Sequence, residues 1–366
     1  MLEDGKISYK CVVGIIFMTI APTAILYLPT ITYKEARQDG WISVLITTLF
    51  GLLVAYAIID LGTMYKSKTI IEYSTDIIGK VPSKILGFLY CCYFIYINAF
   101  IIREFAELLA GAFMIETPIL FFIISIILPS IYGVYKGLEV IVRVNQIIFP
   151  IFMISILAII LYSLKDMDFT NIFPILDNGI QPVIIGGYRN LLWFTEVFVL
   201  AIFMPYINRP EKVRKLSFIS ILIIGLLGAL INLSIVATFG ANTKHLTYPY
   251  LSLARYVSVG FVERLDSIIM FMWIAGVYIK IVIYHYCATL AIGQWLKFKK
   301  FELLSIPIGL LLVILSYILW DSLVKLKYEV KYIVIVPFII MQGVIPVLLF
   351  ILTKIKKILF KKTKKT

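Results

Sequence analysis

The chain has 366 residues, of which 61% are hydrophobic and 15% are charged, whereas about 25% of the residues in ordinary soluble domains are charged. A soluble protein of this length could not bury so much apolar surface, and the apolar residues fall in blocks of about 20, enough for a helix to cross about 30 Å of hydrocarbon. The block length also excludes a transmembrane barrel, whose strands would have about 10 residues of alternating polarity.

The formal net charge is +13, and the basic residues concentrate in short loops and in a tail over 354–366. In a soluble protein this charge would suggest nucleic-acid binding. Beside membrane spans, lysine and arginine set the orientation and contact anionic headgroups. We therefore expect membrane lipids, and no nucleic acid, as partners. The basic residues of the tail are Lys354, Lys356, Lys357, Lys361, Lys362, Lys364 and Lys365.

Motifs for enzymatic chemistry are absent from the sequence. Its four cysteines lie in apolar segments without a CxxC spacing, and its two histidines are His245 and His285. No cluster of histidine, cysteine and carboxylate has the spacing of a metal site. There is neither a Walker A loop nor a G-x-S-x-G elbow. We expect no metal, no cofactor and no enzymatic activity.

The apolar blocks predict an all-α integral membrane protein with about ten transmembrane helices in a single membrane domain, 1–366. Loops between the blocks are brief, which leaves no room for a soluble domain. The predicted spans are 11–30, 41–64, 86–111, 118–135, 140–164, 183–207, 216–240, 264–296, 303–320 and 332–353.

Orientation and internal symmetry follow from this span count. With the N-terminus inside, 21 basic residues fall on the side of the termini and 8 on the other side, which places both termini in the cytoplasm. Five spans is an odd number, so a second set of five begins from the opposite side of the membrane. We therefore expect two inverted repeats, 11–164 and 183–353, with a substrate site at mid-membrane where the first helix of each repeat is broken.

The first span contains a candidate break at its middle. Pro22 removes a backbone donor and clashes with the preceding turn. Thr19 and Thr23 could serve the freed backbone groups or a ligand, with Ala21 and Ala24 beside them. The alternative is an ordinary proline kink that neighbouring helices satisfy.

The sixth span carries an ionisable group near mid-membrane. Glu196 lies about 20 Å along this helix and follows Phe194 and Thr195. A carboxylate at such a depth is costly and indicates a functional site; the alternative is a structural carboxylate paired with a neighbouring helix. The pair Gly186 and Gly187, together with the parallel to span one, predicts a broken helix.

Spans three and eight each place polar and aromatic residues on one face, at intervals of three and four. In span eight, Lys280 lies about 24 Å along the helix and must pair, snorkel or line a cavity. We expect Glu196 and Lys280 to interact directly or across a cavity. The aromatic residues of span three would by themselves indicate packing. Its charged residues Arg103, Glu104 and Glu107 could line a solvated path, and the alternative is that they pair with one another. The two stripes are Tyr93, Tyr96, Phe100, Arg103, Glu104 and Glu107 in span three, and Asp266, Met270, Trp273, Val277, Lys280 and Tyr284 in span eight.

Several stretches resemble the spore germination permease family, the B subunits of endospore germinant receptors, in an order and spacing that cover nearly the whole chain. Thr195 stands where that family usually has a glycine, which implies a less unwound helix. The stretches are Ile102-Arg103-Glu104-Phe105, Phe173-Pro174-Ile175-Leu176 with Gly179 and Pro182, Phe194-Thr195-Glu196 with Pro205, Tyr248-Pro249, Leu253-Ala254-Arg255, Glu263-Arg264-Leu265-Asp266, Trp273 and Ile279-Lys280.

The resemblance implies the LeuT-like fold of the amino acid–polyamine–organocation superfamily and a location in the spore inner membrane. It also implies an A subunit with membrane helices and a lipoprotein C subunit as partners. We expect a transporter-like sensor that binds a small nutrient, often an amino acid, among spans one, three, six and eight. Alternatives are an active permease and a conduit for water or ions. The resemblance does not identify the nutrient.

Overall fold

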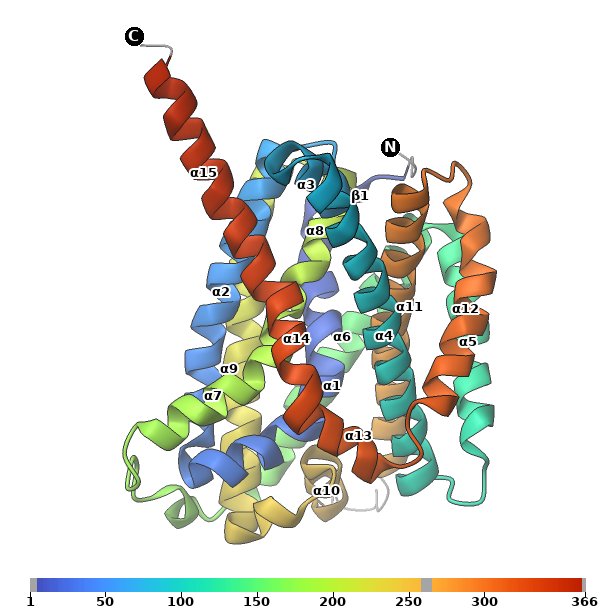
Figure 1. The fold of residues 1–366 in the computed structure, drawn as a ribbon. Coiled ribbons are helices and arrows are strands. Elements are labelled where there is room, and N and C mark those ends of the chain that lie inside the picture. The colour runs from blue at the N-terminus through green and yellow to red at the C-terminus, as the bar shows by residue number, and fades with distance from the viewer. Residues whose placement is uncertain (1–4, 258–264, 364–366) are drawn as a thin grey trace.

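The computed structural model describes residues 5–257 and 265–363, most of which are helical (Figure 1). Each of the ten predicted spans overlaps at least one helix. The described helices are α1 (Val12–Ala36), α2 (Gly40–Met64), α3 (Ile70–Ile78), α4 (Lys80–Ala112), α5 (Ile119–Lys136), α6 (Leu138–Ser163), α7 (Gln181–Phe194), α8 (Leu200–Phe203), α9 (Val213–Phe239), α10 (Pro249–Tyr256), α11 (Leu265–Leu296), α12 (Ser305–Ile318), α13 (Leu323–Glu329), α14 (Ile335–Ile339) and α15 (Ile345–Thr363).

Within the described residues, nine helical stretches are long and apolar enough to cross a membrane. The first of them, Tyr9–Met64, contains both α1 and α2, which a short turn at Arg37–Asp39 joins. The outer helices present large apolar side chains to the surroundings, a distribution suited to lipid and not to water. Examples on α5 and α6 are Phe121, Leu128, Ile147, Ile154 and Leu161, each 61–66% exposed.

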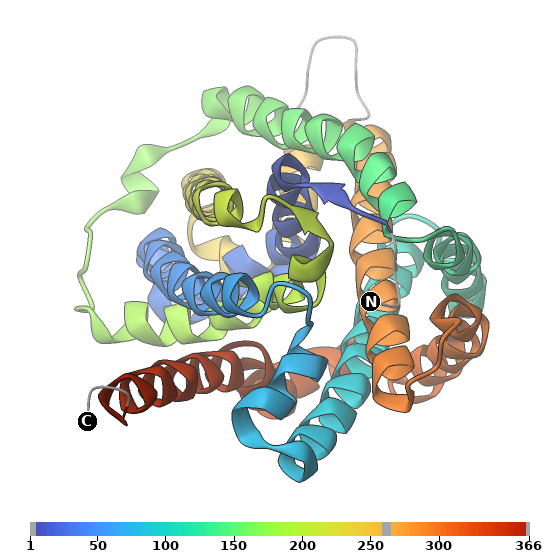
Figure 2. The same cartoon turned by 90° about the horizontal axis from the view of Figure 1, so that it is seen from above.

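Helix α1 is buried along most of its length and packs against α7, α9 and α11 (Figure 2). The expected break at Pro22 is not found: α1 stays α-helical from Val12 to Ala36 with Pro22 and Pro29 inside it. From α11, the Trp273 indole donates to the Pro22 carbonyl over 2.7 Å. The second half of α1 runs obliquely to the first in Figure 1. This span is therefore bent rather than interrupted.

The sixth span is interrupted where the sequence places Glu196. Helix α7 ends at Phe194, a 3₁₀ segment covers Thr195–Val199, and the short α8 follows. The glycine pair is not the cause, since α7 continues through both residues. A β-carbon on Gly186 would lie 2.7 Å from the hydroxyl oxygen of Ser43. The glycines therefore permit close packing of α7 on α2, and the break occurs eight residues later.

The last helical rod runs from α13 through α14 to α15 and contains two π-helical segments, Val330–Val334 and Ile340–Val344. The basic tail predicted from 354 onward continues α15 as helix through Thr363. Single-turn π segments are uncommon and occur frequently at functional sites. In this chain the second one places Gln342 beside the interrupted span six.

Both ends of the described chain lie at the same face of the bundle (Figure 1). At that face the strand β1 (Ile7–Ser8) pairs in parallel with β2 (Ile207–Asn208), directly after span six. Ile7 and Ile207 are both buried in this contact. The backbone thereby ties the start of span one to the end of span six at the face of the termini.

Candidate functional site

A buried ion pair lies at the centre of the bundle. The Lys280 ammonium of α11 donates to both carboxylate oxygens of Glu196, each over 2.8 Å. It also donates to the Thr23 hydroxyl of α1 over 2.5 Å. All three side chains are buried. The predicted interaction of Glu196 with Lys280 is confirmed, and one ammonium joins α1, span six and α11.

The hydroxyl of Thr195 connects span six to the last helical rod. It lies 2.7 Å from the Gln342 side-chain oxygen and 2.7 Å from the Leu191 carbonyl of its own span. Gln342 is fully buried. The sequence analysis missed Gln342, although a lone amide in an otherwise apolar span was a usable signal.

The remaining predicted binding residues are close to this centre but enclose little space. Thr19 donates to the Ile15 carbonyl of its own helix, and Tyr93 and Tyr284 are buried within the core. The void that borders the ion pair has a volume of about 10 Å³, roughly that needed for one water molecule. The other buried members are Ala21, Pro22, Ala24, Phe100, Phe194 and Val277.

A larger cavity of about 420 Å³ lies between this centre and the face opposite the termini. Its wall comes from the second half of α1, from α4 and α7, from the turn after α9, and from the last helical rod between α13 and α14. Such a volume is typical of a small-molecule site. The lining residues are Tyr27, Thr30, Ile31, Lys34, Glu35, Glu104, Arg189, Trp193, Lys244, His245, Leu246, Thr247, Leu326, Lys327, Val330 and Ile335.

Glu104 and Trp193 border both spaces, the large cavity and the small void beside Glu196 and Lys280. They therefore form the partition between the cavity and the ion pair. The sequence analysis placed Glu104 on a polar path but missed most of the cavity wall, because those residues come from the ends of helices that are distant in sequence.

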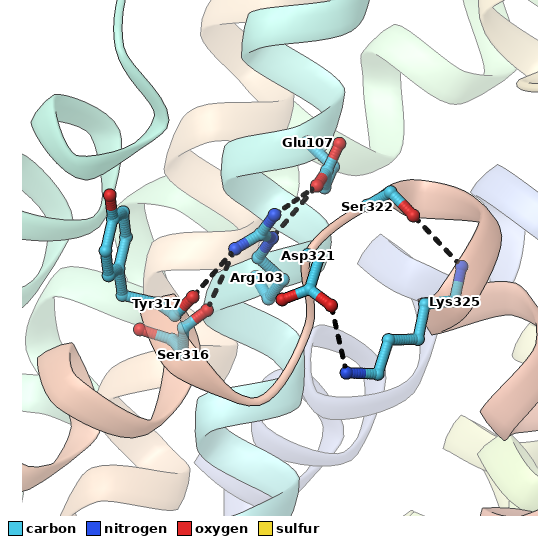
Figure 3. A network of polar contacts seen from close by, with 7 residues as sticks. All are labelled: Arg103, Glu107, Ser316, Tyr317, Asp321, Ser322 and Lys325. Atoms are coloured by element: carbon cyan, nitrogen blue, oxygen red, sulfur yellow. Dashed lines mark hydrogen bonds and ion pairs between the residues drawn. The ribbon is translucent and has the colours of Figure 1, made fainter.

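The other charged residues predicted on span three make different contacts. Arg103 pairs with Glu107 over 2.7 Å and donates to the Ser316 and Tyr317 carbonyls at the end of α12 (Figure 3). Tyr96 donates to Glu329 over 3.1 Å. These two contacts fix α4 to α12 and α13 and do not line the cavity. The side chain of Asp266 lies outside the described part of the chain.

Solved structures with a similar arrangement are membrane transporters. MhsT in complex with L-phenylalanine has a TM-score of 0.68 at 10% identity, covering 96% of this chain and 99% of that chain. A Na⁺-coupled sialic acid symporter has a TM-score of 0.67 at 15% identity, covering 92% and 79%. The chain is thus an integral, multi-pass membrane protein with the LeuT-like transporter fold.

The relatives in sequence identify the family of the chain, which the shared fold alone does not. The profile of the family described as spore germination protein matches residues 6–322. Spore germination protein KB of Bacillus subtilis (strain 168) is 30% identical, covering 86% of this chain and 85% of its own length. Spore germination protein YndE of the same strain is 30% identical, covering 96% and 98%. The chain belongs to the spore germination protein family, and this family and fold are those of permease-like membrane proteins rather than enzymes.

Proposed function

We propose that the chain is the transporter-like B subunit of a spore germinant receptor, which binds a small nutrient and signals through its partners. The observation that supports this most directly is the cavity of about 420 Å³ whose floor adjoins the buried Glu196–Lys280 pair. A nutrient in that cavity would act across Glu104 and Trp193 on a cluster that joins α1, span six and α11. Ligand binding would then shift an equilibrium between two arrangements of these helices.

The orientation in this proposal follows from the basic residues. Both termini lie in the cytoplasm (in the spore, on the core side of the inner membrane), and the cavity opens on the opposite side. The halves 11–164 and 183–353 act as inverted repeats, whose relative movement would open the closed centre around Thr23, Glu196 and Lys280. An A subunit and a lipoprotein C subunit receive the change.

The second candidate function is an active permease for an amino acid or another small solute. The transporters of similar fold favour it, but a shared fold does not establish a shared activity. Both functions use the same cavity, so binding alone cannot separate them. A measurement of solute flux through the isolated chain separates the two functions.

The test uses the purified chain in detergent and in proteoliposomes. We expect thermal stabilisation by at least one compound from a panel of the twenty L-amino acids, glucose and inosine, because a ligand of the folded state raises the melting temperature by mass action. We expect no uptake of the same labelled compound into vesicles that contain this chain alone. Uptake above that of empty vesicles would assign the permease function, and the absence of binding across the panel would reject the receptor proposal.

A further inference from the structure

The segment between α6 and α7, residues 164–180, lies at the face opposite the termini (Figure 1) and follows the edge of the bundle (Figure 2). It contains two short 3₁₀ turns, Leu164–Asp166 and Phe169–Ile172, and otherwise irregular backbone. Irregular backbone exposed to lipid does not occur within the hydrocarbon region, where its polar groups would lack partners. The segment therefore lies outside the hydrocarbon.

Five large apolar side chains of this segment are exposed within a stretch of twelve residues. Outside the bilayer, a concentration of exposed apolar side chains marks an interaction surface. We call these five residues the apolar loop patch. They are Phe169 (55% exposed), Phe173 (64%), Ile175 (46%), Leu176 (41%) and Ile180 (51%).

Polar contacts from other elements hold the loop in place. The buried Asp39 carboxylate accepts a hydrogen bond from the Leu176 N–H over 3.0 Å, and the Gln38 side chain donates to the Pro174 carbonyl over 2.7 Å. The Asp168 N–H donates to a carbonyl at the end of α9 over 3.0 Å. Leu176 has a φ of 57°, which bulky residues rarely adopt. These contacts fix a costly backbone shape that turns the apolar loop patch outward.

The charge of the segment is opposite to that of the chain. Residues 166–180 include Asp166, Asp168 and Asp177 but no lysine, arginine or histidine, whereas the whole chain has a formal net charge of +13. Segments that insert into the membrane interface combine apolar side chains with lysine and arginine, which anionic headgroups attract. The aspartates disfavour that use. The complementary partner is a protein surface with apolar residues and a basic rim.

From these observations we infer that the apolar loop patch is a docking surface for a partner protein. The partner presents an extramembrane surface with an apolar centre and a rim of lysine or arginine. This inference rests on the proposed function and assigns one of the partner subunits to a place on the chain. Phe173 and Ile175 form the apolar contact, and Asp177 lies at its rim.

The loop also adjoins the wall of the large cavity on two sides. It leads directly into α7, which contributes Arg189 and Trp193 to that wall. Asp39 ties it to the turn after α1, a helix that contributes Glu35 to the same wall. A movement of α1 against α7 would therefore change the shape of the loop, and with it the contact to the partner.

The test measures binding of the separately purified A and C subunits to the full chain in lipid nanodiscs. We expect at least one of them to bind the unmodified chain. Phe173→Ser/Ile175→Ser should weaken that binding about 10-fold or more, because two apolar side chains leave the contact. Asp177→Lys should weaken it about 3- to 10-fold and reduce its dependence on salt, because a rim charge is reversed.

The matched control is Met114→Ser/Ile115→Ser, in the turn after α4. These two apolar side chains are also exposed and lie at the same face as the loop (Figure 1). This variant should bind the partner as tightly as the unmodified chain does. Binding by Phe173→Ser/Ile175→Ser that equals the binding of the unmodified chain would overturn the inference.

A fluorophore on Phe173→Cys distinguishes a protein partner from the bilayer. The label is placed in a Cys92→Ser background, because Cys92 is exposed and the other native cysteines are buried. Without a partner, spin-labelled lipid should not quench the fluorophore, and the bound subunit should shift its emission to shorter wavelength. Quenching by lipid would assign the loop to the bilayer. A shift that depends on the concentration of the chain alone would assign it to a second copy. Either result would overturn the inference.

The outcomes also separate this inference from the proposed function. If a subunit binds the unmodified chain and the loop variants equally, the receptor proposal stands and the docking surface lies elsewhere. If neither subunit binds the unmodified chain, the proposed receptor assembly fails, and this inference fails with it. Should Phe173→Ser/Ile175→Ser not fold, the emission of the labelled Phe173→Cys chain with and without the subunit still decides.

Discussion

The two buried glutamates of the site, Glu196 and Glu104, differ in what surrounds them. Glu196 has a lysine on both oxygens and almost no free volume beside it. Glu104 has no hydrogen bond or ion pair among the residues that the structure describes, and it borders about 420 Å³ of space. A satisfied buried charge in a closed core holds helices together, whereas an unsatisfied one on a cavity wall is suited to a ligand. Burial and residue type alone do not distinguish these two roles.

The largest effect is expected from removing the cation of the closed cluster. Lys280→Met leaves Glu196 buried without its partner, which typically costs about 3–5 kcal/mol. We expect the variant to unfold at a much lower denaturant concentration or temperature than the unmodified chain in detergent. The double variant Glu196→Gln/Lys280→Met should recover most of this loss, since no unpaired charge remains.

A matched lysine pair on the surface provides the control for that prediction. Lys325 pairs with Asp321 over 3.3 Å, and both side chains are exposed. Lys325→Met should change stability by about 0.5 kcal/mol or less. If Lys280→Met were equally mild, the ion pair would not hold the three helices, and the contrast between the two glutamates would fail.

The next effect concerns the contact between the interrupted span and the last helical rod. Thr195→Val removes the hydroxyl that bonds Gln342 and leaves that buried amide without this partner. We expect a loss of about 1–2 kcal/mol in unfolding experiments. Thr238→Val is the control, because that hydroxyl bonds only a carbonyl of its own helix. Equal losses in the two variants would show that Gln342 contributes nothing specific.

Much of the fold was predictable because lipid restricts which sequences and backbone structures can cross it. Long apolar blocks must be helices, and the lipid-facing side chains of α5 and α6 give no alternative to spanning. The pairing of Glu196 with Lys280 was predictable for a related reason: each is an ionisable group deep in an apolar span, and the low dielectric there drives opposite charges together.

The sequence predictions that were wrong or incomplete depend on contacts between segments that are distant in sequence. Pro22 did not break α1, which stays α-helical on both sides of the proline among the helices packed around it. No local sequence pattern distinguishes such a kink from a break. Gly186 and Gly187 proved to be a packing surface for α2. The cavity wall joins residues from the ends of five segments, so only the three-dimensional arrangement places Lys327 near Glu104.

Within α4, a further prediction separates a paired glutamate from the unpaired one. Glu107 accepts two hydrogen bonds from Arg103, and both side chains are largely buried. Glu107→Gln removes the charge that balances the guanidinium, so we expect a loss of about 1–3 kcal/mol in unfolding experiments without ligand. A variant as stable as the unmodified chain would mean that the carbonyls at the end of α12 suffice for Arg103.

The smallest effect is expected at Glu104 itself. Glu104→Gln replaces a buried carboxylate that has no hydrogen bond or ion pair within residues 5–257 and 265–363, so it sacrifices no ion pair and lowers the cost of desolvation. We expect the variant to unfold within about 0.5 kcal/mol of the unmodified chain, or to be more stable. A loss as large as that of Lys280→Met would instead reveal a structural partner for this carboxylate, and the two glutamates would then belong to one supporting network.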